Sequence, residues 1–89
     1  MAFNEGEFLY LQGEDGKRSW FRLQFGMIKM GGLGVIDGKR FEGLDDGDVV
    51  EIVGRRFNVF RPGNEIKAQI VRAGFTMQDH PIKSQTADL

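Results

Sequence analysis

The chain has 89 residues, of which 40% are hydrophobic and 28% charged, and it contains eight Phe, one Trp and one Tyr. This length supports one small hydrophobic core, and the apolar content is too high for a disordered chain. The absence of Cys and the single His exclude a disulfide framework, a thiolate nucleophile and a cysteine-rich zinc site. Twelve basic residues against thirteen acidic ones give a net charge of −1, so any nucleic-acid role needs a local basic patch.

Neither a membrane span nor a secretory leader is apparent in the sequence. No window approaches eighteen apolar residues, and the first twenty residues lack a basic start and a small-residue cleavage site. We therefore expect a cytoplasmic protein without a membrane partner.

The first hairpin is predicted around a glycine-containing turn at residues 13–16. Apolar residues recur at every second position on both sides of it, at Leu9 and Leu11 before the turn and at Phe21, Leu23 and Phe25 after it. Period two is the spacing of side chains on one face of a strand. Asp15-Gly16 supplies the positive φ angles that tight hairpin turns require.

A second hairpin is predicted at residues 48–60, with its turn at Gly54 and with Val50 and Ile52 on one face. Between the hairpins, four glycines interrupt the apolar stretch at residues 26–36. Two short strands around a glycine bend suit this stretch better than a helix, because each interior Gly costs a helix about 1 kcal/mol. A single helical turn is predicted to follow, ending at Gly43. Five or six short strands at this spacing predict a mainly β fold, a small barrel at residues 1–62.

The character of the sequence changes after Pro62. Ile66, Ile70 and Val71 recur at helical spacing, which predicts a short linker helix over residues 65–73 that ends at Gly74. Ser84 is predicted to cap a further helix that begins at residue 85. Residues 63–89 are therefore interpreted as a linker helix and the start of a second, truncated domain.

Three Gly-basic-basic triplets recur, and each is followed within two residues by an aromatic. Their cations are Lys17, Arg18, Lys39, Arg40, Arg55 and Arg56. At the starts of strands these pairs would gather at one end of a barrel and contact phosphates. The alternative is that these cations protect strand edges from aggregation. Nearby acidic residues would then weaken their positive electrostatic field: Glu14, Asp15, Asp37 and Glu42.

Aromatic side chains offer a second route to nucleic acid, because small barrels bind single strands by stacking bases on exposed rings. Tyr10 and Trp20 are the candidates, and the competing interpretation is that both belong to the core.

The remaining motifs give weaker evidence of function. The glycines at 31–34 lack the strand and helix of a dinucleotide-binding loop, so a bend in the barrel wall is the preferred interpretation. Asp45, Asp46 and Asp48 lack the spacing of a calcium loop and are predicted to be turn residues. His80 precedes a proline and has no nucleophile partner, which favours a turn residue. An autonomous enzyme is the least supported function, because no convergent polar site is recognisable.

The order of these features resembles the N-terminal domain of the tRNA (adenine-N1)-methyltransferase family, which modifies the T-loop adenosine. The residues that carry the resemblance are the Gly16-Lys17-Arg18 turn, Leu33-Gly34-Val35-Ile36, the helical turn ending in Gly43 and the junction Phe60-Arg61-Pro62. In that family a Pro-Lys-Asp-like segment opens the S-adenosylmethionine-binding domain. His80-Pro81-Ile82-Lys83-Ser84 stands in its place, and Ile82 and Ser84 depart from the pattern.

The resemblance implies a barrel that helps to hold tRNA, with the catalytic Asp and the S-adenosylmethionine loop beyond residue 89. It also implies a homotetramer of the full-length protein, built through the downstream domain. In this chain we expect no catalytic, cofactor-binding or metal-binding residue. The alternative is a free-standing barrel module that mediates protein contacts or oligomerisation through an exposed aromatic face.

Overall fold

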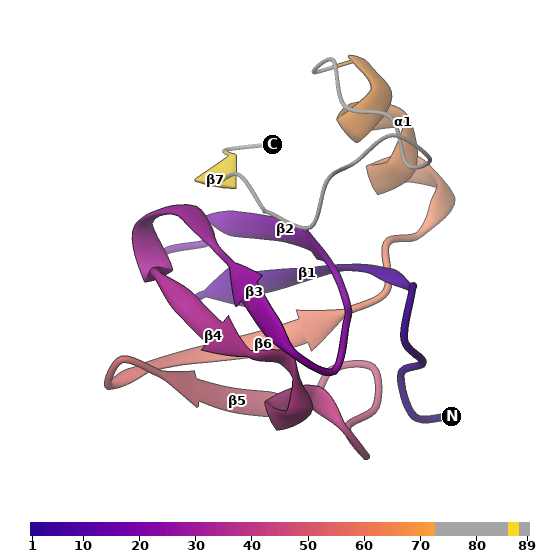
Figure 1. Cartoon of the computed structure of the whole chain (residues 1–89). Coiled ribbons are helices and arrows are strands. Elements are labelled where there is room, and N and C mark those ends of the chain that lie inside the picture. The colour runs from indigo at the N-terminus through magenta and orange to yellow at the C-terminus, as the bar shows by residue number, and fades with distance from the viewer. Residues whose placement is uncertain (73–85, 88–89) are drawn as a thin grey trace.

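The computed structural model describes residues 1–72 and 86–87, and its fold is mainly β with two sheets and one short helix (Figure 1). The elements follow in this order: β1 (Phe8–Gly13), β2 (Arg18–Arg22), β3 (Met27–Lys29), the 3-10 turn η1 (Gly31–Leu33), β4 (Val35–Asp37), the 3-10 turn η2 (Gly38–Phe41), β5 (Val49–Ile52), β6 (Arg55–Phe60), α1 (Asn64–Arg72) and β7 (Thr86–Ala87).

The larger sheet has the strand order β5-β6-β1-β2-β7, and β3 and β4 form a separate two-stranded sheet. All neighbouring strands are antiparallel. Within the described residues the outer strands β5 and β7 do not pair with each other or with β3–β4. The mainly β prediction is therefore confirmed, and the closed barrel is not.

The first predicted hairpin is confirmed. β1 pairs with β2 so that Leu9 lies opposite Phe21 and Leu11 opposite Ser19. Gly16 has φ +81°, and the Asp15 carboxylate accepts a hydrogen bond from the backbone N–H of Lys17 at 3.0 Å. β2 ends at Arg22 rather than at Phe25, because Leu23 exchanges its backbone bonds with Gly6 and Glu7, which precede β1.

The second predicted hairpin is also confirmed, with Val50 opposite Phe57 and Ile52 opposite Arg55. Its turn residues Val53 and Gly54 both have positive φ, at 51° and 70°. Two such residues between paired strands form the type I′ turn, whose twist matches that of the strands. Valine is a poor residue for this conformation, because its branched β-carbon crowds the backbone at positive φ.

The glycine-rich middle segment forms two short strands around a bend, as predicted. η1 follows β3, and Gly34, with φ +78°, returns the chain to β4. Asp37 then caps η2 through a 3.0 Å hydrogen bond from the backbone N–H of Lys39. At Gly38 a β-carbon would lie 1.7 Å from the carbonyl oxygen of Gln24, so only glycine allows this close approach of two backbones.

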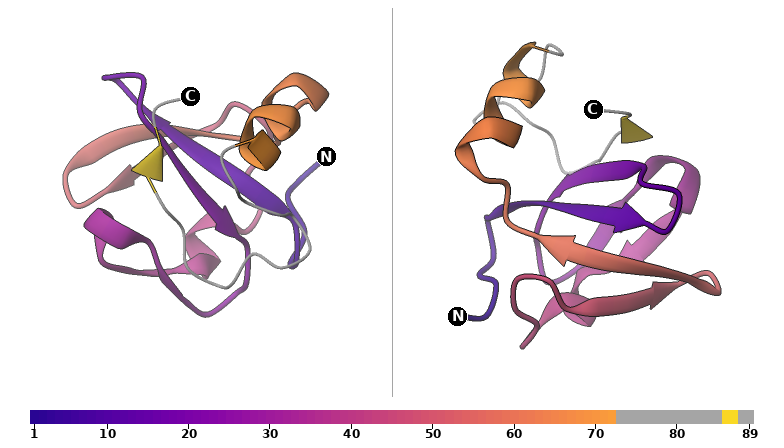
Figure 2. Two further views of the ribbon diagram at one scale, coloured as in Figure 1. Left: turned by 90° about the horizontal axis from the view of Figure 1, so that it is seen from above. Right: turned by 180° about the vertical axis from the view of Figure 1, so that it is seen from behind.

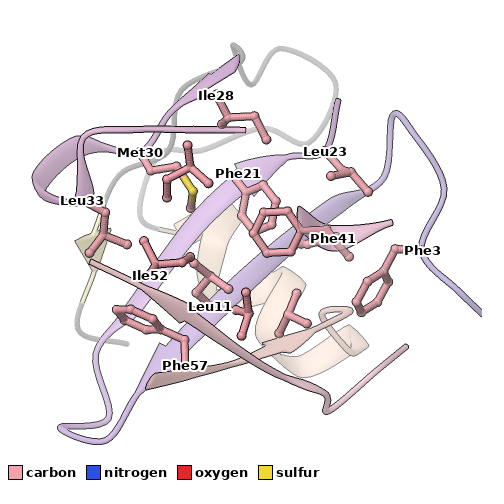
Figure 3. Close-up of a cluster of buried hydrophobic side chains, with 14 residues drawn as sticks. Phe3, Leu11, Phe21, Leu23, Ile28, Met30, Leu33, Phe41, Ile52 and Phe57 are labelled. Atoms are coloured by element: carbon pink, nitrogen blue, oxygen red, sulfur yellow. The ribbon is translucent and has the colours of Figure 1, made fainter. Parts of the chain in front are cut away.

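The main core lies between the larger sheet and the β3–β4 layer (Figure 3). It contains fourteen buried side chains: Phe3, Leu9, Leu11, Phe21, Leu23, Ile28, Met30, Leu33, Ile36, Phe41, Val50, Ile52, Phe57 and Val59. We refer to the side of the larger sheet that faces this core as its inner face. The alternating residues that predicted one buried strand face all contribute to this core except Phe25, which packs against it.

A second, smaller core covers the outer face of the same sheet. Phe8, Tyr10 and Trp20 are buried there with Ile70 of α1, and Phe60 and Ile66 pack against them. Figure 2 shows α1 and β3–β4 on opposite sides of β1–β2. Strand β1 is therefore buried on both faces, which explains its unbroken apolar run.

The helix predicted after Pro62 is confirmed as α1, and Lys67 donates its backbone N–H to the Gly63 carbonyl at 2.9 Å in its first turn. The predicted helix beginning at residue 85 is wrong, because Thr86 and Ala87 form β7 and pair with Ser19 and Arg18. The free edge of β2 offers backbone partners that a short isolated helix lacks. The predictions for Gly74 and for residues 80–84 lie outside the described residues.

Candidate nucleic-acid interface

Strand register brings two of the three basic pairs to the same end of the larger sheet. β1 is the neighbour of both β2 and β6, and its last residue, Gly13, lies opposite Phe57. Arg18 begins β2 and Lys17 directly precedes it, while Arg55 and Arg56 are the first residues of β6. The pairs therefore flank the end of β1, as the sequence predicted for these four residues.

The pairs split between the two faces of the sheet. Arg55 precedes Phe57 and Val59 at the same alternating spacing on β6, which places it in the inner row. Lys17, just before β2, precedes Ser19 and Phe21 at the same spacing. Both cations line a cavity of about 220 Å³ together with Asp15, Ser19, Gly32 and Phe57. We call it the end cavity, because it lies where the apolar inner rows end in polar residues.

The other two cations belong to the outer face. Arg18 donates from Nε to Oε1 of Gln12 at 3.1 Å, and its guanidinium carbon lies 5.6 Å from the centre of the Tyr10 ring. Arg56 lies opposite Glu51 in the β5–β6 pair. Arg56 and Arg55 also line a larger groove of about 520 Å³, in which they face three carboxylates: Glu14, Asp15 and Glu51.

The third pair lies elsewhere, so its predicted position at a strand start is wrong. Lys39 and Arg40 belong to η2, where Gly38 packs against the backbone of Gln24. Arg40 donates from Nη1 to the backbone carbonyl of Glu51 at 2.9 Å, which places this arginine along the edge of β5.

The candidate stacking residues are buried. Trp20 is 0% exposed and Tyr10 is 6% exposed, and their ring centroids lie 4.6 Å apart. Burial raises the pKa of Tyr10, and the nearby charge of Arg18 opposes this effect only in part. The core interpretation is correct for both rings, and neither offers an open face for a base in this structure.

The opposite end of the β1–β6 pair carries a dense ionic network that the sequence did not predict. Arg61 donates from Nε to Oε1 of Glu7 at 2.8 Å and from Nη2 to the carbonyls of Met1 and Ala2 at 2.8 and 3.1 Å. Its Nη1 lies 3.5 Å from Oδ1 of Asp45, and its guanidinium carbon lies 4.6 Å from the centre of the Phe3 ring. We call these contacts the Arg61 network.

The three aspartates predicted to be turn residues hold the loop beside this network. Oδ2 of Asp48 accepts a hydrogen bond from the Asp45 N–H at 2.8 Å, and Oδ1 of Asp46 accepts one from the Arg61 N–H at 2.7 Å. Within the described residues, no group of three or more His, Asp or Glu side chains is arranged to hold a metal ion.

Ser19 and Gly32 are among the lining residues of the end cavity that were not predicted as site residues, although the sequence pattern contained a signal for Ser19. Ser19 follows Phe21 in the alternating row, so its position on the inner face was predictable. Gly32 was interpreted only as part of a bend, because its place beside β2 and β6 depends on how β3–β4 packs.

Comparison with known proteins adds no relative. No protein-family model matches the sequence, and no curated protein matches it. Among the described helices, none combines the length and the apolar character needed to cross a membrane.

Proposed function

We propose that this chain is the RNA-positioning N-terminal domain of a tRNA (adenine-N1)-methyltransferase. The observation that carries the proposal is the gathering of two Gly-basic-basic pairs at one end of the sheet. Clustered Lys and Arg side chains are what a phosphate backbone requires, because neutralised phosphates release their counterions. The motif order that resembles this family supplies the substrate class.

Under this proposal the catalytic work belongs to a domain that follows this one in the full-length protein. That domain would bind S-adenosylmethionine and build the homotetramer, while residues 1–62 hold tRNA. The six cations would share the RNA contacts, with the larger part at Lys17, Arg18, Arg55 and Arg56 and a smaller part at Lys39 and Arg40.

The small-barrel interpretation of residues 1–62 belongs to the same proposal. Its support is the position of the β3–β4 layer over the inner face of the larger sheet, with the main core enclosed between them. A partly open barrel of this kind leaves its interior accessible at one end, where small barrels commonly bind ligands.

A filter-binding titration with tRNA at several salt concentrations tests the proposal. Replacing Lys17, Arg18, Arg55 and Arg56 by Glu should weaken binding and reduce the slope of log K against log salt by about 3, since each lost phosphate contact removes 0.7 to 0.9. The matched control is Lys39→Glu with Arg40→Glu, which should change the slope less. A slope equal to that of the parent chain in the fourfold variant contradicts the proposal.

The alternative function, a module for protein contacts, depended on an exposed aromatic face. Phe8, Tyr10 and Trp20 are instead buried beneath α1. The exposed large apolar side chains include Met27 and Val35 of the β3–β4 hairpin and Val49 and Val53 of the β5–β6 hairpin. Scattered single residues of this kind are normal on a protein surface. We therefore favour the RNA-binding function.

A further inference from the structure

We propose that the end cavity binds one phosphodiester group of a nucleic-acid backbone. This inference rests on the proposed RNA-binding function and deepens it, because it names the chemical group and the residues that receive it. The two cations that carry the inference are Lys17 and Arg55, which end two inner rows of the sheet.

Gly13, the last residue of β1, lies between the strands that carry these cations and lines the neighbouring groove rather than the end cavity. A β-carbon at Gly13 would lie 3.0 Å from Oδ1 of Asp15 and 3.3 Å from Cε1 of Phe57. A larger residue would therefore crowd the space between β2 and β6. The Asp15 carboxylate and the Phe57 ring fill the space beside this glycine, and both also line the end cavity with Lys17 and Arg55.

The far wall of the cavity is formed by the glycine bend at residues 31–34, for which the sequence predicts no binding function. Gly32 lies in η1 and lines the cavity with Lys17 and Arg55. No heavy atom lies within 4 Å of the position that its β-carbon would take. The wall is thus open backbone, which allows a ligand to approach closely.

Charge selects the type of anion. Lys17 and Arg55 each contribute one positive charge, and Asp15 contributes one negative charge, which leaves the cavity with a net charge of +1. A phosphodiester carries one negative charge and matches this value, whereas a phosphate monoester carries about −1.5 to −2 at neutral pH. Asp15 therefore favours a backbone phosphate over a terminal or free phosphate.

The cations are available for such a ligand. Within the described part of the chain, neither the Lys17 nor the Arg55 side chain forms an ion pair. The Arg55 guanidinium carbon lies 5.1 Å from the centre of the Phe57 ring, which positions the group without occupying its donors. Charge-assisted hydrogen bonds from an arginine fork and a lysine are strong contacts to a phosphate.

The neighbouring groove of about 520 Å³ is a poorer site for the same ligand. Two arginines face three carboxylates there, so its net charge is −1. Arg55 and Asp15 line both sites, so the difference comes from the remaining charges, which are Arg56, Glu14 and Glu51 in the groove and Lys17 in the cavity. A phosphodiester is therefore better accommodated on the cavity side. The proposal therefore assigns the backbone contact to Lys17 and Arg55 rather than to Arg56.

The test is an NMR titration of the 89-residue chain with adenylyl-adenosine, a dinucleoside with a single phosphodiester. We expect the amide signals of Lys17, Gly32 and Arg55 to shift most. Lys17→Ala with Arg55→Ala should weaken binding at least about tenfold, since two charge-assisted hydrogen bonds are lost. Gly32→Glu, at an open position, should abolish the shifts while the remaining spectrum shows a folded protein.

Controls separate this inference from the proposed function. Lys67→Ala with Arg72→Ala removes equal charge from exposed positions of α1, outside the cavity, and should leave the titration unchanged. Equal binding by the Lys17/Arg55 variant, or stronger binding of inorganic phosphate than of adenylyl-adenosine, overturns the assignment. If tRNA binding keeps its dependence on the four cations while the cavity signals do not shift, the inference fails and the proposed function stands.

Discussion

The two ends of the β1–β6 pair use their charges in opposite ways. At the end where β6 finishes, Arg61 is satisfied by Glu7, by two backbone carbonyls and by the Phe3 ring. At the end where β6 begins, Lys17 and Arg55 line a cavity without forming an ion pair to any described residue. The ion pairs between described residues all belong to the Arg61 network or to its neighbour Asp45.

The two ends of the β1–β6 pair also differ in backbone conformation. The end with free cations also carries Val53, a β-branched residue held at φ +51° and 76% exposed. Local rules are usually broken where a site needs a particular shape, and the cost is offset by well-satisfied contacts elsewhere. The difference fits the proposed function, in which one end stabilises the fold while the other presents groups to RNA.

The largest effect is expected at the stabilising end. Arg61→Ala should lower the free energy of unfolding by about 2 kcal/mol, because several charge-assisted hydrogen bonds and a ring contact are lost from a partly exposed site. Urea denaturation measures this change. Arg61→Lys is the matched control, because it keeps the charge but loses the planar fork, and it should recover only part of the stability. A loss as small as that of Lys17→Ala would remove the distinction between the two ends.

A change of opposite sign is expected at the other end. Val53→Asn should raise the free energy of unfolding by about 1 kcal/mol, because asparagine tolerates positive φ and a type I′ turn favours Asn-Gly. Val49→Asn is the control, since Val49 is also exposed, at 53%, but lies in β5. It should be neutral or slightly destabilising. Thermal melts of both variants measure the contrast, and destabilisation by Val53→Asn would show that the turn is not strained.

Acid should weaken the Arg61 network, because it protonates Glu7. Burial raises the pKa of Glu7, but hydrogen bonds from Arg61 and from the Asn4 N–H, with the charge of Arg61, lower it more, so that the pKa lies below its ordinary value. The unfolded chain then takes up the proton at higher pH than the folded chain. The stabilisation is complete above the unfolded pKa, about 4.3, and is lost as the pH falls through the lower folded value.

Glu7→Gln tests this pH dependence. The variant should be less stable than the parent chain at pH 7, by less than Arg61→Ala, because the backbone contacts of Arg61 remain. The difference between parent and variant should shrink as urea midpoints are measured from pH 6 down to pH 3. A difference that stays constant over this range would show that Glu7 does not titrate with a lowered pKa.

The smallest effect is expected at the cation pair that belongs to neither end. Arg40→Ala removes one hydrogen bond to the Glu51 carbonyl at an exposed site. Its unfolding free energy should change by less than about 0.5 kcal/mol. Chemical denaturation with and without tRNA checks this, and a large loss in either measurement would extend the division to a third region.

Much of the strand structure followed from the sequence. The alternation of Leu9, Leu11 and Phe21 and the turn residue Gly16 predicted the first hairpin, because period two and positive φ are local properties of the chain. The same reasoning predicted the second hairpin and the break after Pro62. It was wrong for Thr86 and Ala87, because the free edge of β2 decides their strand pairing and that edge is remote in sequence.

The six cations show where local reasoning stops. The triplet pattern identified Lys17, Arg18, Arg55 and Arg56 as a group, but Arg18 and Arg56 point to the outer face while Lys17 and Arg55 line the end cavity. The strand assignments alone do not say which strands become neighbours. The position of Gly32 opposite these cations depends on the packing of the β3–β4 layer.

The composition of the chain, its turns and its alternating apolar residues by themselves determined a small, mainly β protein with a helix after Pro62. Each of these features depends on residues that are close in sequence. The tertiary structure alone decided that Arg61 joins Glu7 across 54 positions, that Tyr10 and Trp20 are covered by α1, and that Lys17 and Arg55 share a cavity. These contacts arise from the pairing of β1 with β6 and from the burial of both faces of the larger sheet, which no local pattern encodes.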